Sequence, residues 1–201
     1  MHSKRIFLAA AAASVLGLPL VGCSESQPSF NGVDITGAEY ARDFRLKDAS
    51  GRERTLADFK GKVVVLFFGY AQCPDVCPTT MAEMAEVRRK LGPDGGRLQV
   101  LFVTVDPERD TPEVMKAYME AFDPGFIALI PTPEQLAAMA RDYKVYYKKV
   151  EGKTPSSYSM DHSAASYVYD PAGRLRLYAR YGAGADAMAA DVKALLASAA
   201  G

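Results

Sequence analysis

The chain has 201 residues, with 24 basic and 24 acidic side chains, so its formal net charge at pH 7 is zero. This balance provides no basic surface of the kind that nucleic-acid-binding proteins need, and we expect no nucleic-acid partner. The length suits one domain with an adequate hydrophobic core, preceded by a short N-terminal extension.

The first residues resemble an export signal followed by a lipid-attachment site. Two basic residues precede an apolar run from Ile6 to Val21, which is short for a membrane-spanning helix. Gly22 and Cys23 then complete a sequence similar to the lipobox of bacterial lipoproteins, although an ordinary secretory signal with a chance cysteine is the alternative. We predict a signal peptide over residues 1–22, a lipid on Cys23, and a place in the bacterial cell envelope, anchored to a membrane and facing the periplasm.

The next segments predict a tether and then a folded domain. Residues 23–37 are polar and contain Gly, Pro and Ser, as flexible linkers do, and the domain is predicted over 38–201. A short strand is predicted over 44–47 and a turn of helix over 55–59. Residues 63–68 are continuously apolar and rich in β-branched side chains, which predicts a strand buried on both faces.

The rest of the chain predicts alternating helices and strands. First come a helix after residue 77 that ends at Gly92-Pro93, a strand over 98–105, and a helix over 114–122 with Thr111 as N-cap and Pro112 at its start. A strand over 126–130, a helix after a capping box at Thr132, and a polar loop over 151–160 follow. The chain ends with strands over 166–169 and 175–181, joined by the turn Asp170-Pro171-Ala172-Gly173, and a final helix around 188–196. Two strands joined through a helix should be parallel, and the late hairpin adds antiparallel strands. This order predicts a single α/β domain with a central mixed sheet flanked by helices, of the thioredoxin-like kind, with an insertion near residues 123–150.

Cys73 and Cys77 carry the strongest chemical signal in the chain. They lie between a predicted strand end and a predicted helix start, with Pro74 and Pro78 beside them. Unpaired N–H groups at a helix N-terminus favour thiolate over thiol, and Pro78 as first helical residue would place Cys77 near the N-cap. Two small buried apolar residues are the simpler alternative. The three intervening residues are compatible with metal binding and do not exclude a redox disulfide.

His162 is the third candidate, since the only other histidine, His2, would leave with the signal peptide. A lone histidine is most often an ordinary surface or core residue. In the predicted fold, however, the loop before the late hairpin packs beside the cysteine loop. Two thiolates and a neutral imidazole form a three-coordinate set that suits Cu(I), with Zn(II) as the alternative, and metal affinity should then fall on acidification.

Several neighbouring residues allow two interpretations. Asp75 caps the helix or lies beside the metal, and we favour the cap. Met81 and Met84 fit a core stripe better than a ligand set, whereas Met160 is a candidate just outside the ligand set. Residues 146–149 form a docking patch or an edge strand, and we favour the strand.

Together these residues closely resemble the Sco/SenC family of thioredoxin-like copper proteins, over roughly residues 38–199. The matching motifs are Phe67-Phe68-Gly69-Tyr70, Cys73-Pro74-Asp75-Val76-Cys77-Pro78, Val105-Asp106-Pro107-Glu108-Arg109-Asp110-Thr111-Pro112 and Asp161-His162-Ser163. The resemblance implies that Cys73, Cys77 and His162 bind copper, with the carried oxidation state, Cu(I) or Cu(II), left open. It also implies delivery of copper to the binuclear site of cytochrome c oxidase subunit II or another copper oxidase, reduction of that site's cysteines, or both, with a thiol reductant or another copper chaperone as a further partner.

Two departures from the family pattern and two rival functions remain. Ala71 and Gln72 stand where family members commonly carry Thr-His, and a predicted lipid replaces the transmembrane helix of many members.

A thiol–disulfide oxidoreductase would use Cys73 and Cys77 as a redox pair with less need for His162. A peroxidase would need one attacking cysteine with Arg and Thr nearby, and paired cysteines flanked by proline do not give that pattern.

Overall fold

The computed structural model describes residues 29–154 and 157–198, so the predicted signal peptide and Cys23 lie outside the described residues. Its strands are β1 (Val33–Asp34), β2 (Leu46–Asp48), β3 (Glu53–Arg54), β4 (Val63–Gly69), β5 (Leu98–Thr104), β6 (Ile127–Ile130), β7 (Tyr147–Val150), β8 (Ser159–His162), β9 (Ser166–Tyr169) and β10 (Leu175–Ala179). Eight of them form one sheet in the order β1-β10-β9-β4-β5-β6-β2-β3, and β7 and β8 pair as a separate hairpin.

The centre of the sheet is the parallel pair β4–β5. All seven residues of each strand are buried, as expected for largely apolar parallel strands with both faces covered. Strand β9 pairs antiparallel on the other side of β4, so the predicted mixed sheet is confirmed. Gly69 aligns with Thr104 at the carboxyl ends of the central strands, so the loops that follow both strands meet at one edge of the sheet.

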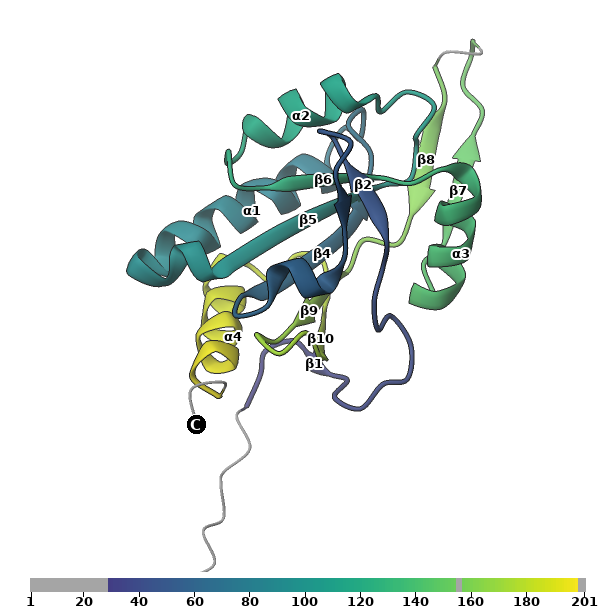
Figure 1. The fold of residues 1–201 in the computed structure, drawn as a ribbon. Helices are drawn as coiled ribbons and strands as arrows, with labels where there is room; N and C mark the ends of the chain where they lie inside the picture. Colours follow the sequence, from purple (N-terminus) through teal and green to yellow (C-terminus); the bar gives the residue numbers. More distant parts are fainter. Residues whose placement is uncertain (1–28, 155–156, 199–201) are drawn as a thin grey trace, which may run out of the picture.

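Helices cover this sheet (Figure 1). They are α1 (Val76–Lys90), α2 (Pro112–Glu120), α3 (Pro133–Tyr143) and α4 (Ala185–Ser198), with 3₁₀ turns η1 (Leu56–Phe59) and η2 (Gly92–Arg97). Helix α1 packs against α4, and α2 packs against β6. None of the helices within the described ranges is both long and apolar enough to cross a membrane.

The predicted caps and turn are present. The Thr111 side chain accepts a hydrogen bond from the Val114 N–H, and Thr132 forms the predicted capping box with Gln135. The backbone N–H of Gly173 donates to the Asp170 carbonyl at 2.8 Å, which closes the turn between β9 and β10. These local signals position the helices because their chemistry depends on neighbours in sequence alone.

Among the predicted boundaries that differ from the structure, two lie next to the candidate site residues. Helix α1 begins at Val76 rather than at Pro78, so Cys77 lies within the first turn instead of at the cap. The polar loop predicted over 151–160 ends early, because Ser159–His162 forms β8 with alternating exposed and partly buried residues. A two-stranded hairpin buries only one face, so β8 has no continuous apolar run to reveal it.

The described residues begin inside the segment predicted as a tether over 23–37, and the described part of that segment is folded onto the domain. Strand β1 pairs with β10, and the buried carboxylate of Asp191 accepts from the backbone N–H groups of Asn31 and Gly32, both at 2.8 Å. Helix α4 thereby fixes the entry of the chain into the domain.

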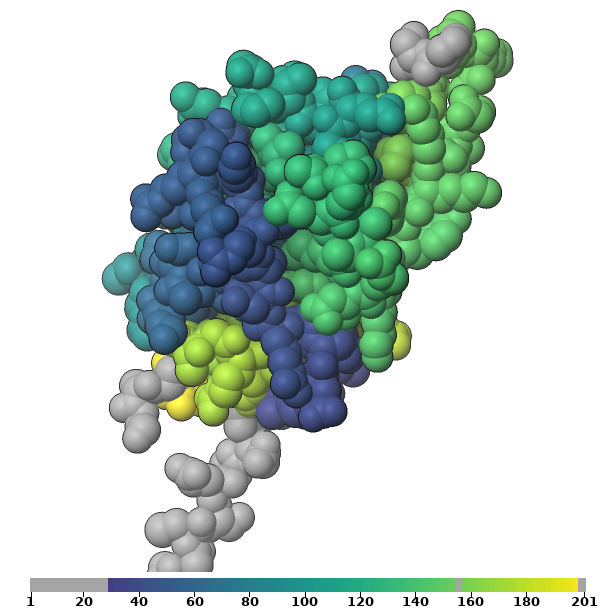
Figure 2. Space-filling view, turned by 45° about the vertical axis from the view of Figure 1, so that its right-hand side comes forward, coloured from purple at the N-terminus to yellow at the C-terminus, as the bar shows by residue number. Residues whose placement is uncertain are grey.

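The β7–β8 hairpin extends from one corner of the molecule. Its tip projects beyond the body, and its base lies against it, as the space-filling view shows (Figure 2). The predicted edge strand over residues 146–149 is confirmed as β7 (147–150), and β8 is its one pairing partner among the described strands. His162 is the last residue of β8, so the hairpin determines where this imidazole lies.

Candidate metal centre

Three side chains from two distant segments meet at the carboxyl end of β4. Cys73 lies in the loop between β4 and α1, Cys77 in the first turn of α1, and His162 at the end of β8. One donor atom from each lies within 4.8 Å of the other two, and Nε2 of His162 is 3.4 Å from Sγ of Cys77. The structure therefore brings together all three residues that the sequence predicted as ligands.

Gly69, the last residue of β4, allows the close approach of α1. A Cβ atom there would lie 2.8 Å from Sγ of Cys77 and 2.7 Å from Cζ of Phe102. These separations are below normal contact distance, so a side chain would displace the sulfur or the phenyl ring. The strand end must be glycine for Cys77 to pack where it does.

Cys73 is the more acidic thiol. The hydrogen bond from the Cys77 side chain is the largest cause that lowers the pKa of Cys73 to about 5, and the N–H groups of Asp75 and Cys77 add to it. The backbone N–H of Cys77 is 3.4 Å from the Cys73 sulfur. The helix start thus favours a thiolate, as predicted, but at Cys73 rather than at Cys77.

Cys77 has the opposite character. Its side chain is fully buried, and the hydrogen bond that it donates to Cys73, together with burial, raises the pKa of Cys77 well above the usual range. The nearby charges of Cys73 and Asp110 act in the same direction. The pair therefore holds one thiolate and one thiol near neutral pH, and these are free cysteines with no disulfide between them.

The imidazole of His162 is oriented by its neighbours. Its Nδ1 lies 3.0 Å from the Ser163 carbonyl, which can only accept, so Nδ1 donates there, and in the neutral ring the Nε2 lone pair faces the sulfurs. The ring also stands edge-on to Phe67 and Tyr70, with centroid distances of 6.0 and 5.9 Å. The group that holds Nδ1 is thus a backbone carbonyl, that of Ser163.

Asp110 is a site residue that the sequence prediction missed. Its buried carboxylate accepts from the Thr104 hydroxyl at 2.5 Å and from the Ala71 N–H at 3.2 Å, so it holds the start of the cysteine loop. Burial is the main cause that raises the pKa of Asp110 to about 6. Its position after β5, beside the end of the parallel neighbour β4, was the available signal.

The other candidates are placed as follows. Asp75 is the N-cap residue of α1 by position, although its side chain makes no capping hydrogen bond to the backbone. Met81 and Met84 are buried in the core, which confirms the core interpretation. A groove of about 400 Å³ opens onto Cys73 and His162, and Met160 also lines it.

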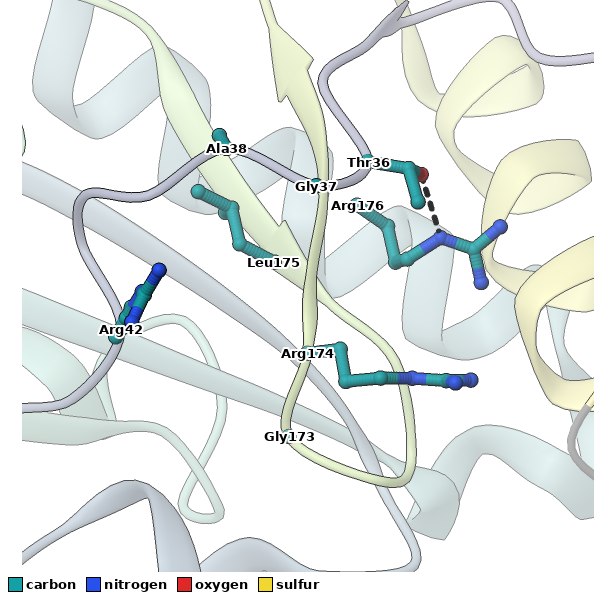
Figure 3. A pocket seen from close by; sticks show the side chains of 8 residues that line it. All are labelled: Thr36, Gly37, Ala38, Arg42, Gly173, Arg174, Leu175 and Arg176. Atoms are coloured by element: carbon teal, nitrogen blue, oxygen red, sulfur yellow. Dashed lines mark hydrogen bonds between the residues drawn. The ribbon is translucent and has the colours of Figure 1, made fainter.

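A second pocket, of about 610 Å³, lies near the start of β4 instead (Figure 3). Its lining includes Arg174 and Arg176, whose side chains extend to the same side, away from Arg42. Both pair with the buried Asp170, and Nε of Arg176 donates to Oγ1 of Thr36 at 2.8 Å. These guanidinium groups stabilise the turn after β9, and no thiol or imidazole lines this pocket.

Comparisons with known proteins give one consistent result. A family model described as SCO1/SenC matches residues 33–197. The Bos taurus protein described as "Protein SCO2 homolog, mitochondrial" is 42% identical over 133 residues, which cover 65% of this chain but only 50% of that protein. The chain therefore spans about half the length of this mammalian relative.

Solved structures extend the similarity to the fold. The structure of Bradyrhizobium japonicum ScoI with copper bound has a TM-score of 0.68 at 42% identity, covering 75% of this chain and 96% of that one. The solution structure of apo Sco1 from Thermus thermophilus has a TM-score of 0.74 at 39% identity, covering 83% and 97% respectively. The predicted thioredoxin-like arrangement is confirmed.

The unequal thiols predict unequal alkylation in the reduced, metal-free protein. Because thiolate is the reactive form, we expect iodoacetamide to modify Cys73 much faster than Cys77, with the rate at Cys73 rising through a pH of about 5. Cys77→Ala removes the side-chain hydrogen bond and should shift this rise to higher pH. Mass spectrometry of the modified peptides between about pH 4 and pH 9 measures both rates.

Cys77→Ser is the matched control, because its hydroxyl still donates to the Cys73 sulfur and should cause a smaller shift. Equal rates at the two cysteines, or an unchanged profile in Cys77→Ala, would contradict the assigned hydrogen bond.

Proposed function

The chain belongs to the SCO1/SenC family, and we propose on this basis that it is a copper-binding factor that delivers copper to the binuclear site of a cytochrome c oxidase. Cys73, Cys77 and His162 would be the ligands. The observation that carries this proposal is the convergence of two sulfurs and one ring nitrogen within 4.8 Å of one another. The copper-bound ScoI structure, which shares the fold at 42% identity, supports the choice of metal.

The chemistry of the donors fits a soft monovalent cation. Thiolate and imidazole are preferred ligands of Cu(I), which accepts three-coordinate sites, whereas structural Zn(II) sites use four ligands. Cys73 is already a thiolate near neutral pH, so a bound cation needs to displace only the Cys77 proton. Acid should weaken binding, because protons compete for every donor atom.

Delivery requires that the metal be reachable. The groove that opens onto Cys73 and His162 would let a client ligand approach while Cys77 stays buried against β4. Copper would then pass by exchange of one ligand at a time, with the partly exposed donors replaced first. The client in this proposal is subunit II of the oxidase or another copper oxidase.

A second function, thiol–disulfide exchange, is favoured by the contrast between the two thiols. The Cys73 thiolate would attack a client disulfide and form a mixed disulfide while one client thiolate leaves. Cys77 would then lose its proton and attack the Cys73 sulfur, giving a Cys73–Cys77 disulfide and releasing the second client thiol. The client gains two electrons and the chain loses two, so a thiol reductant must restore the reduced pair.

Replacing His162 separates the two functions. His162→Ala removes one copper donor but neither thiol, so we expect Cu(I) affinity to fall by more than about tenfold while disulfide reduction changes little. Competition with a chromogenic Cu(I) chelator, under anaerobic conditions, measures affinity. The rate of reduction of a model disulfide measures exchange.

Asp94→Asn is the control, because Asp94 is an exposed residue on η2 outside the groove that opens onto Cys73 and His162, and both quantities should stay unchanged. If the reduced wild-type chain binds no copper, the copper role fails. Full affinity in His162→Ala would remove the imidazole from the ligand set.

The anchor belongs to the same proposal. A lipid on Cys23 would hold the domain at a bacterial membrane, on the periplasmic side, through the segment that leads to β1. We expect the full chain produced in bacteria to incorporate labelled fatty acid and sediment with membranes, and Cys23→Ser to do neither. An unlabelled wild-type chain in the soluble fraction would contradict the anchor.

A further inference from the structure

The position of His162 depends on contacts other than the main sheet. Its strand, β8, pairs only with β7, and neither belongs to the eight-stranded sheet. The two cysteines, by contrast, are attached to β4 and α1 in the core. Some interaction outside the ladder must therefore hold the hairpin against the cysteine loop.

Arg109, in the loop after β5, makes that connection. Its Nη1 donates to the Tyr158 carbonyl at 2.8 Å and to Oε1 of Gln72 at 3.0 Å, and its Nε donates to Asp106 at 2.5 Å. Gln72 immediately precedes Cys73, and Tyr158 immediately precedes β8. One planar guanidinium thus joins the cysteine loop, the loop after β5 and the hairpin.

The Tyr158 ring completes the connection from the side of the hairpin. It lies between two cations, with Cζ of Arg109 at 3.5 Å and Nζ of Lys149 at 3.8 Å from its centroid. Its hydroxyl donates to Asp106 at 2.7 Å, and Lys149 pairs with Glu108 at 2.9 Å. Tyr158 and Asp106 are buried and Arg109 is mostly covered, so solvent screens the contacts among these three less than it screens the exposed Lys149–Glu108 pair.

We propose that Arg109 and Tyr158 form a latch that positions His162 against the two sulfurs and so determines the affinity for copper. Neither residue reaches the metal centre as a ligand, so both are positioning residues. The proposal rests on the proposed copper function, but its structural half concerns the metal-free protein as well.

Two features favour positioning over general stabilisation. Tyr158 immediately precedes the short strand β8, and His162 is the last residue of that strand, so a displacement at Tyr158 is transmitted along β8 to the imidazole. The same guanidinium also contacts Gln72, so one side chain holds both the loop that carries Cys73 and the segment that leads to His162.

The first test uses metal-free protein and graded variants. Arg109→Lys keeps the positive charge but removes the planar guanidinium with its several N–H donors. Tyr158→Phe keeps the aromatic ring and removes only the hydroxyl. Tyr158→Ala removes both the ring and the hydroxyl. We expect faster amide hydrogen exchange in β7 and β8, least in Tyr158→Phe, with unchanged protection in β4 and β5. Loss of protection throughout the sheet, or none in the hairpin, would overturn the latch.

The second test is a double-mutant cycle on copper binding. We expect Arg109→Lys to lower Cu(I) affinity by about tenfold or more and to change the thiolate-to-Cu(II) charge-transfer band. In a His162→Ala background the same change should have little further effect, because Arg109 acts through the imidazole. Arg97→Ala, an exposed arginine on η2, is the control and should leave affinity unchanged.

The outcomes distinguish the two proposals. An equal loss of affinity from Arg109→Lys with and without His162 would show a general effect and overturn the latch. A wild-type chain that binds no copper would refute the copper role, and the exchange measurement on metal-free protein would still decide whether the latch holds the hairpin.

Discussion

The contact between the His162 imidazole and the Cys77 sulfur, 3.4 Å apart, joins two segments separated by 85 positions in the chain. The donor set of Cys73, Cys77 and His162 exists only if this contact is made. One partner is fixed by the core, because Cys77 packs on the end of β4 where Gly69 leaves room for the sulfur. The other is carried by a hairpin outside the main sheet. The sulfur side of the site is therefore held by the core, and the nitrogen side is held by contacts outside the main sheet.

The electrostatics of the pair follow from unequal burial. Cys77 is enclosed and remains protonated, while Cys73 receives hydrogen bonds at the helix start and ionises. Below them lies Asp110, a buried acid that holds the loop through the Ala71 N–H. Burying the Cys77 thiol and the Asp110 carboxyl beside the Cys73 thiolate lowers the free energy of unfolding. Clusters of buried ionisable groups of this kind concentrate at functional sites. Copper binding and disulfide exchange draw on the same asymmetry, which explains why one site supports both proposals.

Much of this arrangement was predictable from sequence, because its signals are local. The continuous apolar run of β4, the caps at Thr111 and Thr132, and the turn at Asp170 each depend on adjacent residues, and each is found in the structure. Strand β8 was missed, since a hairpin with one exposed face has no apolar run. Arg109 and Asp110 were quoted within a family motif but given no role of their own, because their partners Tyr158 and Ala71 are distant in sequence. The predicted start of α1 was two residues too late, and the thiolate was therefore predicted at Cys77 instead of Cys73.

X-ray absorption at the copper edge of the anaerobically loaded chain tests the assembled ligand set most directly. The account predicts two sulfur neighbours and one nitrogen with the multiple scattering of an imidazole, and loss of that imidazole signal alone in His162→Ala. A spectrum with sulfur neighbours only in the wild-type chain, unchanged by removal of His162, would contradict it.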